Sequence, residues 1–278
     1  MKTLSLGNVG DDVGLLQQRL VRAGYLLDVA HVYDGPTEAA IKAVQVKSGL
    51  VIDGIAGPKT YAAISAGRRD PKHLTDADLS RAADVLGVPI ACVRAVNEVE
   101  SRGSGFLPDG RPVILFERHV FWRCLEQRGI DPAPLALRNP NIVSQAYGGY
   151  RGGSAEYVRL ASAEQIDAGA AYESTSWGAF QVMGHHWQRL GYASIDDFVS
   201  RMETSEGEHL DAFVRFVAAD VGLLSALKAR KWAAFAKAYN GPHYARNQHD
   251  ARLAQAYLKY ATKPAPSRAR TVAEGRAA

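Results

Sequence analysis

The chain has 278 residues, of which 47% are hydrophobic and 22% are charged, a composition that is typical of a globular protein and excludes a disordered chain. Its 33 Lys and Arg residues exceed its 29 Asp and Glu residues by four, and this excess lies entirely in residues 66–74 and 264–278. We therefore expect roughly two domains. Neither is expected to carry a basic face that binds nucleic acid.

Cysteine usage and hydropathy limit which cofactors the protein could bind and in which compartment it is made. Cys92 and Cys124 are too few for a disulfide framework, and no spacing of Cys and His residues suits zinc, so we expect no metal and no other cofactor. The N-terminus lacks the apolar segment of an export signal, and no run of about 18 apolar residues is present. These features predict synthesis in the cytoplasm and no stable insertion into a membrane.

Residues 1–66 predict a compact unit of three helices. Apolar residues at helical spacing from Val13 to Leu20 indicate the first helix. The other two follow from a repeat, in which Thr37 and Thr60 each open a Thr-x-Ala-Ala-Ile segment shortly after an Asp-Gly pair. We expect each of these threonines to be the N-cap of a helix.

These motifs resemble the small peptidoglycan-binding domain found at the ends of many cell-wall hydrolases. The resemblance covers about residues 3–66 and rests on the ordered segments VGLLQQRLVRAGY, YDGPTEAAIKAVQVKSGL and IDGIAGPKTYAAI. The first Asp-Gly block is shorter than in the family, and Val44 stands where an aromatic residue is usual. The resemblance implies that peptidoglycan is a partner of this domain.

The rest of the chain predicts a linker, a larger domain and a tail. Residues 67–74 are expected to form the linker, residues 75–263 a mainly helical domain, and residues 264–278 a flexible basic tail. A Pro-Asp-Gly turn between two apolar arms predicts a β-hairpin over 105–116. The fold class is therefore mainly α, with a small three-helix domain and a larger α+β domain that contains a short β-hairpin.

A helix over residues 89–101 places two acids in different environments. Glu100 continues the apolar stripe of this helix, whereas Glu98 lies about 160° away beside Arg94, as in an ordinary surface pair. A carboxyl at the end of an apolar stripe is shielded from water, which favours the protonated form that a general acid needs. Taken alone, a Glu at a helix end is more often a structural hydrogen-bonding residue, so the pattern leaves both roles open.

Two further acids follow. Asp109 lies at the tip of the predicted hairpin, and the short link after Glu100 keeps that hairpin close. Glycosidic cleavage needs an acid and, for inversion, a base or water-holding group, so Asp109 is a candidate for the second carboxylate. Turn preference alone also explains an Asp at this position. We expect Glu117 to support the site, unless a neighbouring basic residue holds it as a structural ion pair.

Other candidate residues suit a saccharide cleft. A Ser-Thr-Ser-Trp-Gly-Ala-Phe-Gln segment contributes Trp177 and Gln181, whose amide can bond an N-acetyl group in both directions. A later helix ends at Tyr239 and Asn240 before a Gly-Pro stop, so that their polar tips can project into a groove. The aromatic residues that precede them in that helix are explained better by burial in the core than by contact with a saccharide.

The motifs around these residues resemble the goose-type lysozyme and soluble lytic transglycosylase superfamily. The similarity lies in Glu-Ser-Arg-Gly, Gly-Ala-Phe-Gln-Val and Ala-Tyr-Asn-Gly, in that order, at 100–103, 178–182 and 238–241. Longer segments resemble the N-acetylmuramidase domain of modular phage endolysins, namely 96–121, 147–163 and 174–184. This resemblance covers nearly all of residues 76–263.

The resemblance implies a lysozyme-like fold and a role for each candidate. Glu100 would be the general acid and Asp109 the second carboxylate of the site. The glycan cleft would be lined by Gln181, Tyr239, Asn240 and, in the glycine run, Tyr150.

The function implied is that of an endolysin. It would cleave the β-1,4 bond between N-acetylmuramic acid and N-acetylglucosamine in peptidoglycan and cause host lysis. We expect a monomer that reaches the periplasm after a separate holin opens the inner membrane, and a tail that contacts anionic lipid.

Three alternatives stay open. A lytic transglycosylase uses the same acid and leaves 1,6-anhydro ends, and a wall-binding protein would need no catalysis. A cell-wall amidase would need an activated thiol or a metal site, but Cys92 lies in an apolar helix and the histidines lack metal spacing.

Overall fold

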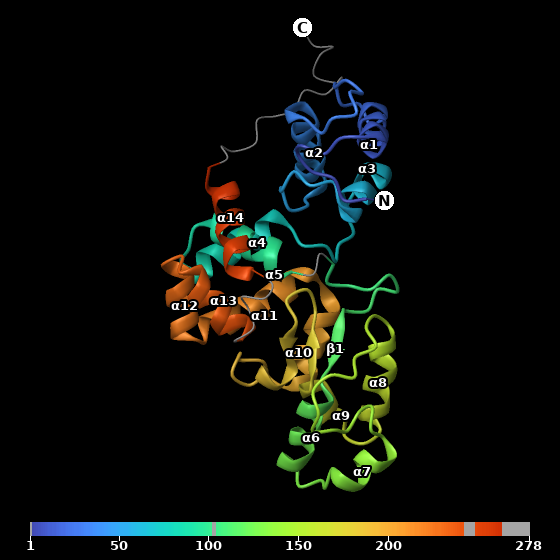
Figure 1. Ribbon diagram of the computed structural model, residues 1–278, viewed down its shortest axis with the longest axis vertical. Helices are drawn as coiled ribbons and strands as arrows, with labels where there is room; N and C mark the ends of the chain where they lie inside the picture. Colours follow the sequence, from blue (N-terminus) through green and yellow to red (C-terminus); the bar gives the residue numbers. More distant parts are fainter. Residues whose placement is uncertain (1, 102–103, 242–247, 263–278) are drawn as a thin grey trace. The chain divides into compact units, whose positions relative to one another are not determined.

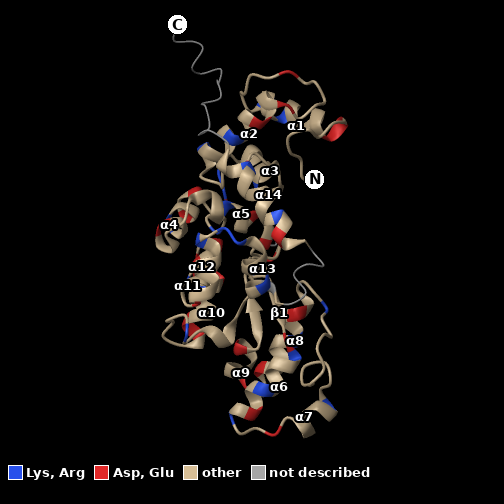
Figure 2. Ribbon diagram, turned by 60° about the vertical axis from the view of Figure 1, so that its left-hand side comes forward, with Lys and Arg blue, Asp and Glu red and all other residues tan. Residues whose placement is uncertain are grey.

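The structure is a computed structural model that describes residues 2–101, 104–241 and 248–262, with only the backbone of Asn240. It forms two compact units, which meet in the sequence at Leu79 and Ser80. Acidic and basic residues are interspersed along the helices of each unit (Figure 2). Within the described ranges, no helix combines the length and the apolar character that crossing a membrane requires.

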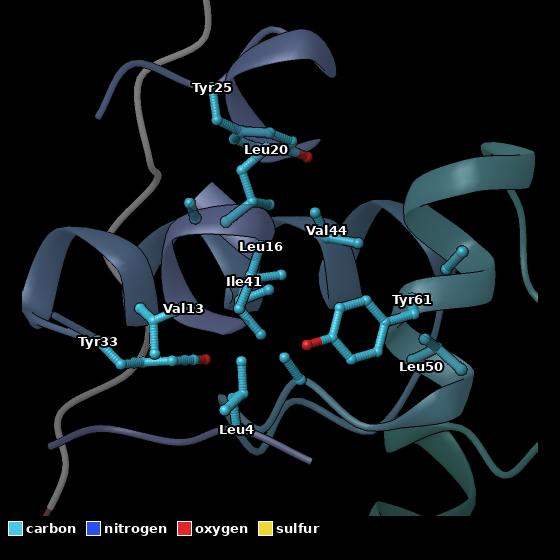
Figure 3. Close-up of a cluster of buried hydrophobic side chains, with 13 residues drawn as sticks. Leu4, Val13, Leu16, Leu20, Tyr25, Tyr33, Ile41, Val44, Leu50 and Tyr61 are labelled. Carbon is cyan, nitrogen blue, oxygen red and sulfur yellow. The ribbon is translucent and has the colours of Figure 1, made fainter. Parts of the chain in front are cut away.

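The first unit is built on three helices. They are α1 (Asp11–Arg22), α2 (Gly35–Ser48) and α3 (Pro58–Ala66). Their apolar faces meet in one core, in which Leu16, Ile41 and Tyr61 point toward one another (Figure 3). The predicted three-helix unit is confirmed.

Both expected N-cap threonines lie inside their helices. The N-cap of α2 is Asp34, whose Oδ1 accepts hydrogen bonds from the backbone N and the Oγ1 of Thr37 at 2.9 and 2.6 Å. Helix α3 starts after Gly57, and Thr60 donates its hydroxyl to the carbonyl of Ile55 at 3.1 Å. The prediction was wrong because a proline stands in the first turn of each helix, where proline is favoured, so each helix begins before its threonine.

The second unit is mainly helical (Figure 1). Its helices are α4 (Asp76–Leu86, which spans the unit boundary), α5 (Ile90–Glu100), α6 (Arg118–Gln127), α7 (Ala133–Arg138), α8 (Ala155–Glu164), α9 (Ala168–Glu173), η1 (Gly184–His186), α10 (Ile195–Thr204), α11 (Glu206–Ala218), α12 (Val221–Lys228), α13 (Trp232–Asn240) and α14 (His249–Ala261). Helix α14 packs against both α5 and α13. This packing joins the start of the unit to its end.

A small antiparallel sheet lies in the second unit. Its strands are β1 (Ile114–Phe116), β2 (Thr175–Trp177) and β3 (Val182–Met183), paired in that order. The predicted turn forms at the expected place, with Gly110 N donating to Leu107 O at 3.0 Å. Only one isolated bridge, Phe106 to Pro112, joins the two arms in the described part of this hairpin. Its second arm becomes β1 and pairs instead with β2, a partner from far along the chain.

Candidate active site

Glu100 is the last residue of α5, and the helix phase buries its side chain. The helix begins directly after Pro89 and turns Cys92, Val93 and Val96 inward. The Glu100 side chain is 3% exposed, whereas that of Glu98 is 33% exposed. The predicted difference in burial between the two acids is confirmed.

Glu98 has partners other than the expected one. Its Oε2 accepts from Lys259 Nζ and from Tyr260 Oη, each at 2.6 Å. The guanidinium of Arg94 instead lies over the Tyr260 ring, 5.9 Å from its centre. The predicted pair with Arg94 was wrong, because α14 packs on α5 and supplies closer donors.

The buried carboxyl of Glu100 meets a histidine from the far end of the unit. His249 opens α14, and its Nδ1 lies 3.2 Å from Glu100 Oε1. At this distance the two side chains can form a hydrogen bond, whose direction depends on which ring nitrogen carries the proton. His249 was not predicted from the sequence, because nothing local marks a contact across 149 positions.

Asp109 lies at the surface and is held by its own turn. Its carboxylate accepts from Arg111 Nη2 at 2.6 Å, from Arg111 Nε at 3.1 Å and from the backbone N of Arg111 at 3.1 Å. These bonds lower the pKa of Asp109 and favour its ionised form. Among the described residues, no hydrogen bond or ion pair links Asp109 to Glu100.

Two buried residues of α11 hold the segments around the site. Glu206 Oε1 accepts from the backbone N of Gly105 at 2.8 Å, and His209 Nδ1 accepts from that of Ala179 at 3.2 Å. His209 Nε2 lies 2.7 Å from the Met202 carbonyl, so the bonds at both nitrogens require a neutral ring that is protonated on Nε2. The start of the hairpin and the turn between β2 and β3 are thereby fixed to one helix.

Neither of these two residues of α11 was predicted from the sequence. Their only local signal was a Glu and a His three positions apart on the apolar face of that helix. At that spacing both side chains lie on one helix face, but the sequence does not show which backbone amides they meet.

Gln181 occupies the turn between β2 and β3 with a positive φ of 53°. Its Nε2 donates to the carbonyls of Gly178 and Val113 at 2.8 and 3.2 Å, and its Oε1 accepts from Ser176 Oγ at 3.1 Å. The amide therefore bonds in both directions, as expected of its chemistry, but to the protein itself.

The two predicted aromatic residues differ in exposure. Trp177 is 2% exposed and donates its indole N–H to the Tyr172 carbonyl at 3.2 Å, so its burial does not favour the predicted contact with glycan. Tyr239 is half-buried and donates its hydroxyl to the Phe180 carbonyl at 2.8 Å, which anchors the end of α13 to the Gln181 turn. Asn240 is the last residue of α13, and its side chain lies outside the described residues.

Glu117 follows β1 and is buried within a cluster of aromatic and imidazole rings. Tyr150 Oη donates to its two oxygens at 3.0 and 2.8 Å, and His119 Nδ1 lies 3.3 Å from Oε2. Burial, together with the bond to Glu117, raises the pKa of Tyr150, so the phenol stays protonated and donates. Glu117 thus orients Tyr150.

An ion pair fixes the glycine segment that carries Tyr150. Glu156 is fully buried, accepts from the backbone amides of Phe116, Arg151 and Gly152 at 3.1, 2.5 and 2.9 Å, and pairs with Arg159 Nη1 at 2.6 Å. The segment is therefore tied to the end of β1.

The requirements of an amidase are not met in the described ranges. Cys92 and Cys124 are buried and free, and burial raises the pKa of both thiols, so neither is an activated nucleophile. Within the same ranges, no group of three or more His, Cys, Asp or Glu side chains could hold a metal ion.

Comparisons with known proteins agree with this picture. The N-acetylmuramidase family model matches residues 89–261, and that of a putative peptidoglycan-binding domain matches residues 9–64. The crystal structure of a Burkholderia AP3 phage endolysin is similar, with 56% identity and a TM-score of 0.90, over 94% of this chain and 100% of that chain.

A third similarity is partial. The chain is 40% identical over 74 residues to the N-acetylmuramoyl-L-alanine amidase CwlL of Bacillus licheniformis. That match covers 24% of this chain and 21% of the amidase, so the chain spans only about a fifth of that relative.

The muramidase match covers more than half of the chain and includes α5, the sheet and α14. The expected resemblance to modular endolysins is confirmed. The chain belongs to the N-acetylmuramidase family of glycoside hydrolases and joins that domain to a peptidoglycan-binding domain, as in a phage endolysin.

Proposed function

We propose that Glu100 is the general acid of this N-acetylmuramidase and protonates the glycosidic oxygen between N-acetylmuramic acid and N-acetylglucosamine. The observation that carries this proposal is the burial of its carboxyl, 3% exposed, at the end of α5. This position keeps the carboxyl out of bulk water, where a general acid can pass its proton directly to a bound substrate. His249 supports this role because its Nδ1, 3.2 Å from Glu100 Oε1, can hold the carboxyl in place by a hydrogen bond.

Asp109 is proposed to act on the water. Its bonds to Arg111 keep it ionised, and an ionised carboxylate can orient a water and take its proton. As the bond between the anomeric carbon and the bridging oxygen breaks, that oxygen receives the proton of Glu100. The water oxygen then bonds to the anomeric carbon as Asp109 takes the proton of the water. Asp109 releases that proton to solvent and Glu100 takes one up, so that both carboxyls return to their starting states.

The remaining site residues are proposed to hold the glycan. Gln181, Tyr239 and Asn240 lie on the turn and helix end that adjoin each other, and Tyr150 lies beyond β1 with Glu117 as its support. Trp177 is buried at the end of β2 and supports this site from within the core.

The biological setting is proposed from the endolysin architecture. Residues 1–66 would bind the wall, residues 67–74 link it to the catalytic domain at 75–263, and residues 264–278 form a basic tail. The protein would act as a monomer, made in the host cytoplasm and admitted by a holin to the peptidoglycan of the periplasm.

A matched pair of variants tests the acid. Glu100→Gln should lower the rate of cell-wall lysis by about 10²- to 10⁴-fold, the usual contribution of general acid–base catalysis. Glu98→Gln should stay close to the wild type, because it removes only an exposed ion pair worth about 0–1 kcal/mol. Turbidity of purified cell walls gives the rates, and comparable losses in the two variants would refute the assignment.

Product analysis separates hydrolysis from transglycosylation. Mass spectrometry of the released muropeptides should find reducing ends, since water is the proposed nucleophile. Ends with a 1,6-anhydro ring would mean that the 6-hydroxyl of the sugar attacks instead.

A further inference from the structure

A pocket outside the site of Glu100 opens beside Tyr150. It has a volume of about 370 Å³ and lies where α6 begins, against the loop after α7 and the glycine segment before α8. Its lining consists of Arg118, Pro140, Asn141, Gly149, Tyr150 and Arg151. Two of these six residues are cations, and none is an acid.

Arg118 is held in place by backbone carbonyls. Its Nε donates to Ala146 O at 2.9 Å, and Nη1 and Nη2 donate to Pro140 O and Tyr147 O, each at 3.3 Å. A guanidinium has five N–H donors, so these three bonds leave two for a ligand. Its charge is not neutralised by any carboxylate within ion-pair distance among the described residues.

Gly149 lets the backbone approach this guanidinium. A Cβ at that position would lie 3.0 Å from Arg118 Cζ, and the φ of +85° is one that side-chain-bearing residues rarely adopt. The cation is therefore built into the wall of the pocket.

Arg151 supplies the second cation. Its backbone N is fixed by Glu156, whereas its exposed side chain makes no hydrogen bond or ion pair in the described part of the chain. Two acids that contact this segment have other partners, since Glu156 pairs with Arg159 and Glu117 accepts from Tyr150. The pocket thus keeps a net positive charge.

We propose that this pocket binds a carboxylate of the stem peptide carried by peptidoglycan. The inference rests on the proposed function, in which the glycan passes Tyr150. The N-acetyl sugars linked along the strand are neutral, and the anionic groups of the polymer are the carboxylates of its peptides. A guanidinium matches a carboxylate with two parallel hydrogen bonds, and the Asn141 amide suits the adjoining peptide bond.

The test compares soluble glycan strands that carry stem peptides with the same strands after the peptides are removed. Arg151→Gln should raise KM for the peptide-bearing strands about fivefold, the size of a charge-assisted hydrogen bond that is partly screened. Its kcat should not change, and neither should its KM for peptide-free strands. Chromatography of labelled strands follows the cleavage, and added salt should shrink the effect.

Arg123→Gln is the matched control. Arg123 is an exposed arginine of α6 that does not line the pocket, so its loss removes the same charge from a position outside the pocket. Arg151→Lys should recover part of the affinity, because lysine keeps the positive charge but cannot make the two parallel hydrogen bonds of a guanidinium. Equal effects of Arg151→Gln and Arg123→Gln, or equal effects of Arg151→Gln on the two kinds of strand, would overturn the proposal.

A binding measurement separates failure of this inference from failure of the proposed function. Fluorescence anisotropy of the labelled strands is measured with full-length Glu100→Gln protein, with and without Arg151→Gln. Weaker binding of only the peptide-bearing strands supports the pocket, even if the wild type cleaves neither strand. Unchanged binding of both strands refutes the pocket, even if cleavage depends on Glu100.

Discussion

Replacing Glu156 with Gln should destabilise the catalytic unit and loosen the segment that carries Tyr150. The carboxylate is fully buried, pairs with Arg159 at 2.6 Å and accepts three backbone amides. Gln has the same shape but no charge, so Arg159 is left buried without its counter-ion. Breaking one side of a buried pair costs about 3–5 kcal/mol, a large part of the roughly 5–15 kcal/mol that stabilise a typical domain.

The loss should depend on pH in a defined direction. Burial alone would raise the pKa of Glu156, but hydrogen bonds from the amides of Arg151, Gly152 and Phe116 and the charge of Arg159 lower it below the ordinary value of 4.5. Because the folded-state pKa is the lower one, the stabilisation is complete above pH 4.5 and is lost as the pH falls through that folded-state pKa. The wild type and Glu156→Gln should therefore converge in stability in acid.

Denaturant unfolding across this pH range measures the free-energy difference, and hydrogen exchange reports the amides of Arg151 and Gly152. Glu203→Gln is the control, because Glu203 is an exposed acid of α10 without a hydrogen-bond partner in the described ranges. A Glu156→Gln variant as stable as Glu203→Gln at neutral pH would contradict a stabilising role of the buried ion pair. A difference from the wild type that persists unchanged in acid would contradict the expected pH dependence.

Two further variants test the shell around the site. Gly178→Ala should cost about 2–4 kcal/mol of unfolding free energy in denaturant titrations, because its Cβ would collide with the His209 ring at a φ of +73°; a variant as stable as the wild type would contradict the tight turn. His249→Leu should lower kcat about tenfold with little change in KM, since Glu100 loses a hydrogen-bonding partner that positions its carboxyl, and His249→Gln should restore part of that loss. Steady-state kinetics on labelled strands compare His249→Leu with His249→Gln. Equal kcat values for these two variants would argue against a hydrogen-bonding role of His249.

Local patterns predicted much of the fold correctly. Helical periodicity alone predicted that the Glu100 side chain is buried and that the Glu98 side chain is exposed. The direction in which each residue of a helix points depends only on its position along that helix. The three-helix unit followed from the same kind of pattern. The N-caps predicted at Thr37 and Thr60 were wrong because the prediction considered only the capping preference of threonine. The proline in the first turn of each helix marks an earlier start.

The sequence by itself determined the family, the helices and the environment of the two acids, all of which depend on residues close together in the chain. Only the tertiary structure decided that β1 pairs with β2, that His249 meets Glu100, and that Glu206 holds Gly105 across 101 positions. These contacts form because buried amides, carboxyls and imidazoles must find partners wherever packing brings them. No periodicity within a single segment records which partner that will be.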